Sequence, residues 1–210
     1  MTVPLFIPYL NRPDLLDKAV ASVKRCKSVN VLVLNNSERK IPYLCNTPPV
    51  PLTFSQTQNW MLRQAENIHA PFYLFMHSDA EAGEGTVKKL VEMSQSLTDE
   101  GRKWGVIWTA YDALAAFNTA AFRAVGGWDQ MLTWYLSEVD VYRRLRLAGY
   151  ELIDSNLPVK HEPSQTLNSD PYIQMCVNLE VPFRERYYFL KWGGAAGRET
   201  YLTPFNLERI

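Results

Sequence analysis

Three polar residues, His77-Ser78-Asp79, directly follow the apolar run Phe72–Met76, and Asp79 is well placed to do chemistry. In open parallel sheets, ligands bind beyond the carboxyl ends of the strands. A carboxylate at such a strand end can hold a divalent cation that in turn binds a diphosphate. The alternative is that Asp79 is a loop carboxylate that caps the next helix. A cation would need further oxygen or imidazole ligands, for which the candidates are His161, Asp140, Glu138, His77 and Glu81.

A second pair of acids, Glu138 and Asp140, lies at the start of the most regular helical pattern, residues 137–150. A carboxylate at a helix start is held ionised by the helix dipole and points out of the end of the helix. A general base in that position can face an acceptor hydroxyl. The alternative is structural, because Ser137 and Asp140 have the spacing of a capping box. This alternative explains Asp140 better than Glu138.

Two further strand ends carry polar residues that could contact a ligand. Residues 9–12 follow the first apolar run, and residues 35–38 follow the second. Asn, Ser and Asp are also ordinary turn residues, so either segment can equally be a plain loop.

Along the chain, apolar runs typical of strands alternate with segments of helical period. These elements must position the polar residues described above. This order predicts βαβ units and an α/β fold with a mainly parallel, Rossmann-like sheet flanked by helices. We expect strands at residues 3–9, 30–34, 72–76 and 104–110, with short ones at 151–153 and 159–161. We expect helices from Pro13 and at 56–68, 85–97, 119–125, 137–150 and 182–190, with Ser137 as the cap of the helix at 137. Four prolines in residues 41–53 predict an extended connector.

The composition, with 47% hydrophobic residues, fits one domain over residues 1–210. The 22 Lys and Arg residues balance 22 Asp and Glu residues, so no broad field directs the protein to nucleic acid or an anionic membrane. No run approaches the roughly 18 apolar residues of a membrane span, and the start of the chain does not have the pattern of a signal peptide. Three widely spaced cysteines fit a reducing compartment, so we expect a cytoplasmic protein.

Several short motifs follow one another in an order that resembles a known enzyme family. Residues 3–12 (VPLFIPYLNR) are similar to its apolar strand and Pro-x-x-Asn-Arg type turn, and residues 31–37 to its second strand and nucleoside-contacting loop. Asn59 is similar to the Asn of the helix before the metal strand, and residues 75–79 (FMHSD) to the D-x-D region. Residues 124–129 (AVGGWD) resemble its acceptor-side turn, and residues 137–150 its acidic helix signature. On these motifs the chain resembles the inverting GT-A glycosyltransferases of family 2 and its neighbours, over roughly residues 3–165.

The resemblance implies a single GT-A domain that uses Mn²⁺ or Mg²⁺, with Asp79 and His161 as metal ligands. It makes Glu138 the catalytic base, while Asp140 orients the surroundings of Glu138 or binds the acceptor. The residues expected to bind the donor are Pro8, Tyr9, Asn11, Arg12, Asn35, Asn36, Asn59, His77, Ser78, Asp79, Lys191 and Trp192. The residues expected to contact the acceptor are Gly127, Trp128 and Asp129.

Three positions depart from the pattern of the family. His77 stands in place of the first acid of D-x-D, which affects metal affinity and metal choice. Asn35 or Asn36 stands in place of the usual Asp of the nucleoside loop, and an amide can still hydrogen-bond a base edge. Glu138 stands in place of a more common Asp and has a longer reach.

The implied reaction is a direct displacement that inverts the anomeric carbon of a nucleotide-diphosphate sugar, with a UDP-sugar favoured. It transfers a hexose or pentose to an acceptor hydroxyl. The acceptor could be a glycan, a lipid carrier, a protein, a small metabolite or a modified DNA base. Lys191 and Trp192 precede the glycine-rich residues 193–197, so we expect residues 186–210 to form a flexible lid or tail that closes over the donor.

Two other classes of function stay open. A nucleotidyltransferase also uses an α/β sheet, a cation and acids at strand ends, but it should carry a glycine-rich loop after the first strand, and residues 8–13 contain no glycine. A Rossmann dehydrogenase fails for the same reason. The second class is a catalytically inactive module that binds sugar or nucleic acid, since six Trp and eleven Tyr could stack on sugars or bases.

Overall fold

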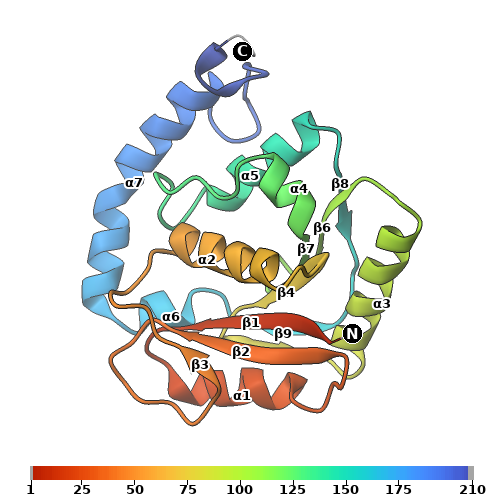
Figure 1. Cartoon of the computed structure of the whole chain (residues 1–210). Helices are drawn as coiled ribbons and strands as arrows, with labels where there is room; N and C mark the ends of the chain where they lie inside the picture. Colours follow the sequence, from red (N-terminus) through yellow and green to blue (C-terminus); the bar gives the residue numbers. More distant parts are fainter. Residues whose placement is uncertain (1, 208–210) are drawn as a thin grey trace.

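A computed structural model describes residues 2–207, and its centre is a seven-stranded sheet (Figure 1). The strand order is β3-β2-β1-β4-β7-β6-β8. β7 runs antiparallel to its neighbours β4 and β6, and the remaining neighbours pair in parallel. The predicted α/β fold with a mainly parallel sheet is therefore confirmed. The strands are β1 (Val3–Tyr9), β2 (Val29–Asn35), β3 (Cys45–Asn46), β4 (Phe72–Met76), β6 (Trp104–Thr109), β7 (Leu114–Asn118) and β8 (Glu151–Asp154).

The pairing of the central strands brings their carboxyl ends to one edge of the sheet. β1 and β2 pair in parallel from Val3–Val29 to Tyr9–Asn35, so Tyr9 and Asn35 end side by side. β4, which is buried along its whole length, pairs in parallel with β1 on the other side. The polar residues that follow β1, β2 and β4 therefore leave the sheet at the same edge.

Helices cover both faces of the sheet because alternate strand residues point to opposite sides. Leu5 and Ile7 of β1 belong to the core on the face covered by α1 (Pro13–Val23) and α3 (Thr86–Asp99). Phe6 belongs to the opposite core, together with residues of α2 (Phe54–Asn67), α4 (Thr119–Ala124) and α5 (Ser137–Leu147). Figure 1 shows α1 and α2 on opposite sides of β1 and β2.

α2 begins two residues earlier than the sequence pattern predicts, because a capping box fixes its start. The Thr53 hydroxyl accepts from Gln56 N, and Gln56 Oε1 accepts from Thr53 N at 2.9 Å. These bonds satisfy donors that a helix start otherwise leaves free. The connector over residues 41–53 contains no helix, as expected, and it includes the short strand β3.

A separate pair of short strands links two distant parts of the chain. β5 (Ala80–Ala82) pairs antiparallel with β9 (Val159–His161), and Ala80 lies opposite His161. This pairing places His161 next to the loop that follows β4.

The C-terminal part of the chain differs from the prediction. α6 (Gln165–Asn168) precedes α7 (Pro171–Trp192), and the 3-10 helix η1 (Pro204–Asn206) follows. The predicted helix start at Pro182 was wrong, because Asp170 caps the helix through the N–H groups of Tyr172 and Ile173 and the helix continues through Pro182.

Among residues 2–207 no helix, α7 included, combines the length and apolarity that a membrane crossing requires. Residues 208–210 of the predicted tail lie outside the described residues.

Candidate active site

Three side chains with metal-ligand chemistry, His77, Asp79 and His161, meet at the end of β4. His77 follows β4 directly, Asp79 precedes β5, and His161 ends β9. His161 Nε2 lies 3.3 Å from Asp79 Oδ1, and one ligand atom from each of the three residues lies within 4.8 Å of the others. One carboxylate and two imidazoles are a donor set that fits a divalent metal ion. We call these three residues the triad.

Burial and charge set the protonation of two members of the triad. Burial lowers the pKa of His77 to about 4, against a smaller raising effect of Asp79, so His77 is neutral at pH 7. The Phe54 ring stacks on this imidazole with centroids 6.0 Å apart. Burial alone would raise the pKa of Asp79, but a hydrogen bond from His161 and smaller electrostatic effects of the two nearby imidazoles lower it overall. His77 and Asp79 are therefore in the forms that bind metals.

The residues at the carboxyl end of β1 lie at the same edge of the sheet, and two of them carry buried polar atoms without partners among residues 2–207. Tyr9 is buried, and its hydroxyl has no hydrogen-bond partner among residues 2–207. Asn11 Nδ2 donates to Thr166 O at 3.0 Å, whereas its buried Oδ1 has no partner in the same part of the chain. Pro8 is half-buried before them. The hydroxyl and the amide oxygen are thus available to a ligand or to water.

Arg12 follows β1 and is paired with a nearby carboxylate. Its guanidinium donates to the Asp14 carboxylate at 2.7 Å, and this bond raises the pKa of Arg12. The carboxylates of Glu162 and Asp79 add smaller raising effects. Ser78, between two triad residues, is buried.

The two asparagines after β2 hold the loop that follows them. The Asn35 amide donates to Arg39 O at 2.8 Å and accepts from Ser37 Oγ at 2.7 Å. The Asn36 amide bonds to Leu52 and to Thr57 Oγ1. A cleft of about 360 Å³ opens beside Asn35 and Ser37, and the triad does not line it. A contact of either asparagine with a nucleoside stays a prediction.

Asn59 joins α2 to the glycine turn that precedes α5. Its amide accepts from Trp128 N and donates to Trp128 O, both at 2.8 Å. Gly127 has φ +71, and a Cβ there would lie 2.5 Å from Asn59 Oδ1, so only glycine fits. Trp128 is buried and stacks on Phe122 at 5.8 Å. The structure gives this turn a packing role, and its contact with an acceptor stays a prediction.

Glu138 lies in the first turn of α5, although the predicted cap of that helix was wrong. Leu136, in the left-handed region at φ 66, precedes the helix, and Ser137 makes no capping bond. The single proton of Ser137 Oγ has two acceptors within reach instead, Trp134 O at 3.2 Å and Glu138 Oε2 at 3.0 Å. Burial raises the pKa of Glu138, against smaller lowering effects of backbone and Ser137 hydrogen bonds. A carboxylate with a raised pKa is better suited to accept a proton than an ordinary one.

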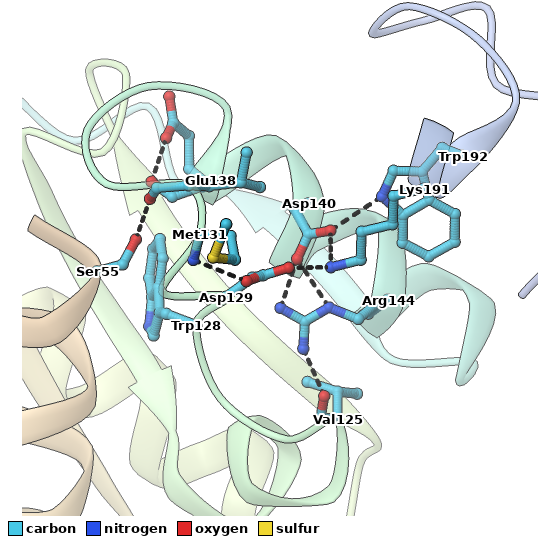
Figure 2. Close-up of polar contacts among 12 residues, drawn as sticks. Ser55, Val125, Trp128, Asp129, Met131, Glu138, Asp140, Arg144, Lys191 and Trp192 are labelled. Atoms are coloured by element: carbon cyan, nitrogen blue, oxygen red, sulfur yellow. Dashed lines mark hydrogen bonds and ion pairs between the residues drawn. The ribbon is translucent and has the colours of Figure 1, made fainter. Parts of the chain in front are cut away.

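Asp140 points away from Glu138 and is fully used in ion pairs (Figure 2). Its Oδ1 lies 2.6 Å from Lys191 Nζ and accepts from Trp192 Nε1 at 2.9 Å. Its Oδ2 accepts two bonds from Arg144, at 2.9 and 2.6 Å. Asp140 therefore has no oxygen left for an acceptor hydroxyl, and it is neither a helix cap nor exposed. Its predicted orienting role toward Glu138 remains a prediction.

Lys191 and Trp192 attach the end of α7 to α5 in this structure. Lys191 Nζ lies 2.6 Å from Asp129 Oδ2 as well as from Asp140, and Figure 2 shows it between the two carboxylates. Trp192 is fully buried beside Leu132. The chain then turns back, and the N–H groups of residues 200 and 201 donate to Trp192 O. A contact of Lys191 or Trp192 with a donor would require α7 to leave this position, so their donor role and the lid stay predictions.

The sequence did not predict the hairpin between β6 and β7, whose turn contacts both the end of β4 and α5. Ala113 O accepts from His77 N at 3.0 Å, so the turn contacts the end of β4. The neighbouring Asp112 accepts from Tyr142 Oη of α5 at 2.7 Å. The only signal was the run Leu114–Asn118 between polar residues, and its alanines are weak strand formers.

The comparisons with known proteins establish the fold. No family model matches the chain, and no curated protein sequence matches it. Among solved structures, S. aureus TarS gives a TM-score of 0.58 at 11% identity and covers 86% of this chain, which in turn covers 40% of TarS. Residues 1–349 of TarS in complex with UDP give 0.53 at 12% identity, with 69% of this chain and 55% of that chain covered. A cytidylyltransferase from Leptospira borgpetersenii gives 0.54 at 10% identity, with 74% and 76% covered.

Proposed function

We propose that this protein is a metal-dependent inverting glycosyltransferase, which moves a hexose or pentose from a nucleotide-diphosphate sugar, with a UDP-sugar favoured, to an acceptor hydroxyl. The observation that carries the proposal is the triad at the end of β4, together with the β6–β7 turn that contacts both His77 and α5, the helix that carries Glu138. A cation site for the leaving group and a general base for the acceptor are what a displacement at a sugar carbon requires. The similarity of the fold to UDP-bound TarS supports the choice of donor.

The triad fits Mn²⁺ or Mg²⁺ as the proposed cofactor, because its ligand atoms are close together and Asp79 is ionised. His77, Asp79 and His161 would hold the ion. A bound cation would supply Lewis acidity that offsets the charge of the leaving diphosphate. Arg12, which follows β1 at the same edge of the sheet, is a further proposed contact of the donor.

Glu138 is the proposed base that removes the proton of the acceptor hydroxyl. Its raised pKa follows from burial, and Ser137 Oγ fixes one of its oxygens at 3.0 Å. One displacement at the anomeric carbon inverts its configuration. The ion pairs of Asp140 with α7 hold the helix that carries Glu138.

The second candidate function is a nucleotidyltransferase, and the observation in its favour is the similar fold of the cytidylyltransferase. The two functions differ in the bond that is broken. In nucleotidyl transfer, a sugar phosphate attacks the α-phosphorus of a nucleoside triphosphate, the bond from the α- to the β-phosphate breaks, and pyrophosphate leaves. In glycosyl transfer, the acceptor oxygen attacks the anomeric carbon, the bond from that carbon to the diphosphate oxygen breaks, and a nucleoside diphosphate leaves.

Product analysis by phosphorus NMR separates these functions. The protein is incubated with Mn²⁺ and either a set of UDP-sugars, or CTP and UTP with hexose 1-phosphates. Release of UDP from a UDP-sugar, with water taking the place of the acceptor, supports the proposal, and release of pyrophosphate in the second mixture supports the alternative. An intact UDP-sugar that nevertheless binds would indicate an inactive binding module. In binding titrations, Asp79→Asn should abolish the tightening of UDP binding by Mn²⁺.

A further inference from the structure

The turn between β6 and β7 has an unusual backbone. Ala110, Tyr111 and Asp112 have φ values of 42, 59 and 61, so three consecutive non-glycine residues occupy the left-handed region. This region is costly for residues with a Cβ, and such strain persists only where the surrounding structure enforces it. The Tyr111 ring is 99% exposed at the tip of the turn. The turn therefore holds one aromatic ring in solvent and directs the next side chain inward.

The inward side chain is Asp112, and α5 holds it in place. Its Oδ2 accepts a 2.7 Å hydrogen bond from Tyr142 Oη. Tyr142 is itself buried, and its ring stacks on Trp108 of β6 with centroids 5.3 Å apart. An anchored carboxylate keeps acceptor sites on its other oxygen for a further partner.

Asp112 lies between the two halves of the proposed active site. Tyr142 and Glu138 are four residues apart on α5 and share one face of the helix, so Asp112 meets the face that carries Glu138. The charge of Glu138 adds to the effect of burial in raising the pKa of Asp112. On the other side, Ala113 O accepts from His77 N at 3.0 Å.

We propose that Asp112 binds a hydroxyl of the sugar that is transferred, and that the exposed Tyr111 ring packs on the same sugar. This inference rests on the proposed function. If the triad holds the diphosphate and Glu138 faces the acceptor, the sugar must lie between them, beside Asp112. A carboxylate accepts hydrogen bonds from sugar hydroxyls, and aromatic rings pack on the apolar faces of sugars. Because a site built around one hydroxyl rejects analogues that lack it, Asp112 would select the donor sugar.

The test compares the affinity for UDP with the affinity for UDP-sugars in the presence of Mn²⁺. Isothermal titration of the parent protein with UDP, UDP-glucose, UDP-galactose and UDP-N-acetylglucosamine identifies the UDP-sugar that binds best. In Asp112→Asn, which keeps the size and the acceptor for Tyr142, UDP should bind within about twofold of the parent. The selected UDP-sugar should bind roughly 10- to 100-fold more weakly, as expected for the loss of a hydrogen bond to a charged group.

Two further variants control this result. Asp99→Asn removes an exposed acid at the end of α3 and should leave both affinities unchanged. Tyr111→Ala changes only an exposed side chain, so it cannot fail through loss of the core. It should weaken binding of the UDP-sugar several-fold more than binding of UDP.

An equal loss of affinity for UDP and UDP-sugar in Asp112→Asn, or no loss of affinity in both Asp112→Asn and Tyr111→Ala, overturns the assignment. If the parent binds neither UDP nor any UDP-sugar, the proposed function itself fails, and the assignment fails with it.

Discussion

Lys191 Nζ lies 2.6 Å from Asp140 Oδ1, and this contact ties the last turn of α7 to the first turn of α5. Both side chains are buried, and the same ammonium also pairs with Asp129. Lys191 and Asp140, both expected in the active site, thus belong to an internal ion-pair network. Glu138, whose partner is the neighbouring Ser137, is left as the acid of this region that can act on a substrate.

Loss of the Lys191 charge should destabilise the protein strongly. Lys191→Met leaves Asp129 and Asp140 buried without this partner, which costs about 3–5 kcal/mol. The melting temperature should fall by about 10 °C, since a protein of this size loses roughly 2–4 °C per kcal/mol. Differential scanning calorimetry measures the change. Lys160→Met, which removes an exposed partner of Glu81, is the control and should hardly alter the melting temperature. Similar small shifts in both variants would mean that α7 is not held by this network.

The triad should prefer Mn²⁺ to Mg²⁺. Imidazole suits transition metals, whereas Mg²⁺ favours oxygen ligands, and two of the three triad residues are histidines. Calorimetric titration should give at least about tenfold tighter binding of Mn²⁺, and His77→Asp should narrow this ratio by improving Mg²⁺ binding. His69→Asp, at an exposed histidine after α2, should change neither affinity. An unchanged ratio in His77→Asp would exclude His77 as a ligand.

The stability of the protein should respond to pH through Asp112. Burial raises the pKa of Asp112 from 3.8 to about 7, and the charges of Glu138 and Asp154 add to this effect. A carboxyl whose pKa is raised on folding stabilises the native state at low pH, and this contribution is lost as the pH rises toward 7. Asp112→Asn removes the charge, so it should raise the melting temperature at pH 8 by a few degrees relative to the parent. At pH 4.5 the gain should largely disappear. The same gain at both pH values would show that Asp112 does not carry the raised pKa.

The parts of the fold that the sequence predicts are those in which local pattern and packing agree. β1 and β4 are continuous apolar runs, and the structure gives them the predicted bounds. β7 was not predicted because three of its five residues, Leu114–Asn118, are alanine or asparagine, and only its neighbours β4 and β6 make it a strand. The predicted start of α7 was wrong because the expected helix began at residue 182, whereas Asp170 caps a helix that starts at Pro171 and continues through Pro182.

The candidate site could be predicted only in part, because several of its contacts join segments that are far apart in the sequence. The position of Asp79 follows from the end of an apolar strand, but its contact with His161 depends on the β5–β9 pairing. Asp140 has the spacing of a capping residue, and only the tertiary structure shows that Arg144, Lys191 and Trp192 bind it. Asp112 has no sequence signal, because aspartate is an ordinary turn residue and its partner Tyr142 lies in a distant helix.

The central claim is that Glu138 is the base of a sugar transfer, and the rate at which Glu138→Gln releases UDP from a UDP-sugar tests it most directly. The substitution keeps the size of the side chain and removes proton acceptance, so the rate should fall by roughly 10²–10⁴-fold while the affinity for the UDP-sugar and Mn²⁺ is unchanged. The control is Asp140→Asn, which should lower the melting temperature because Lys191 and Arg144 lose a charged partner. The account would be contradicted by two results together: Glu138→Gln is nearly active, and Asp140→Asn is folded and binds the UDP-sugar normally but does not release UDP. The roles of the two acids would then have to be exchanged.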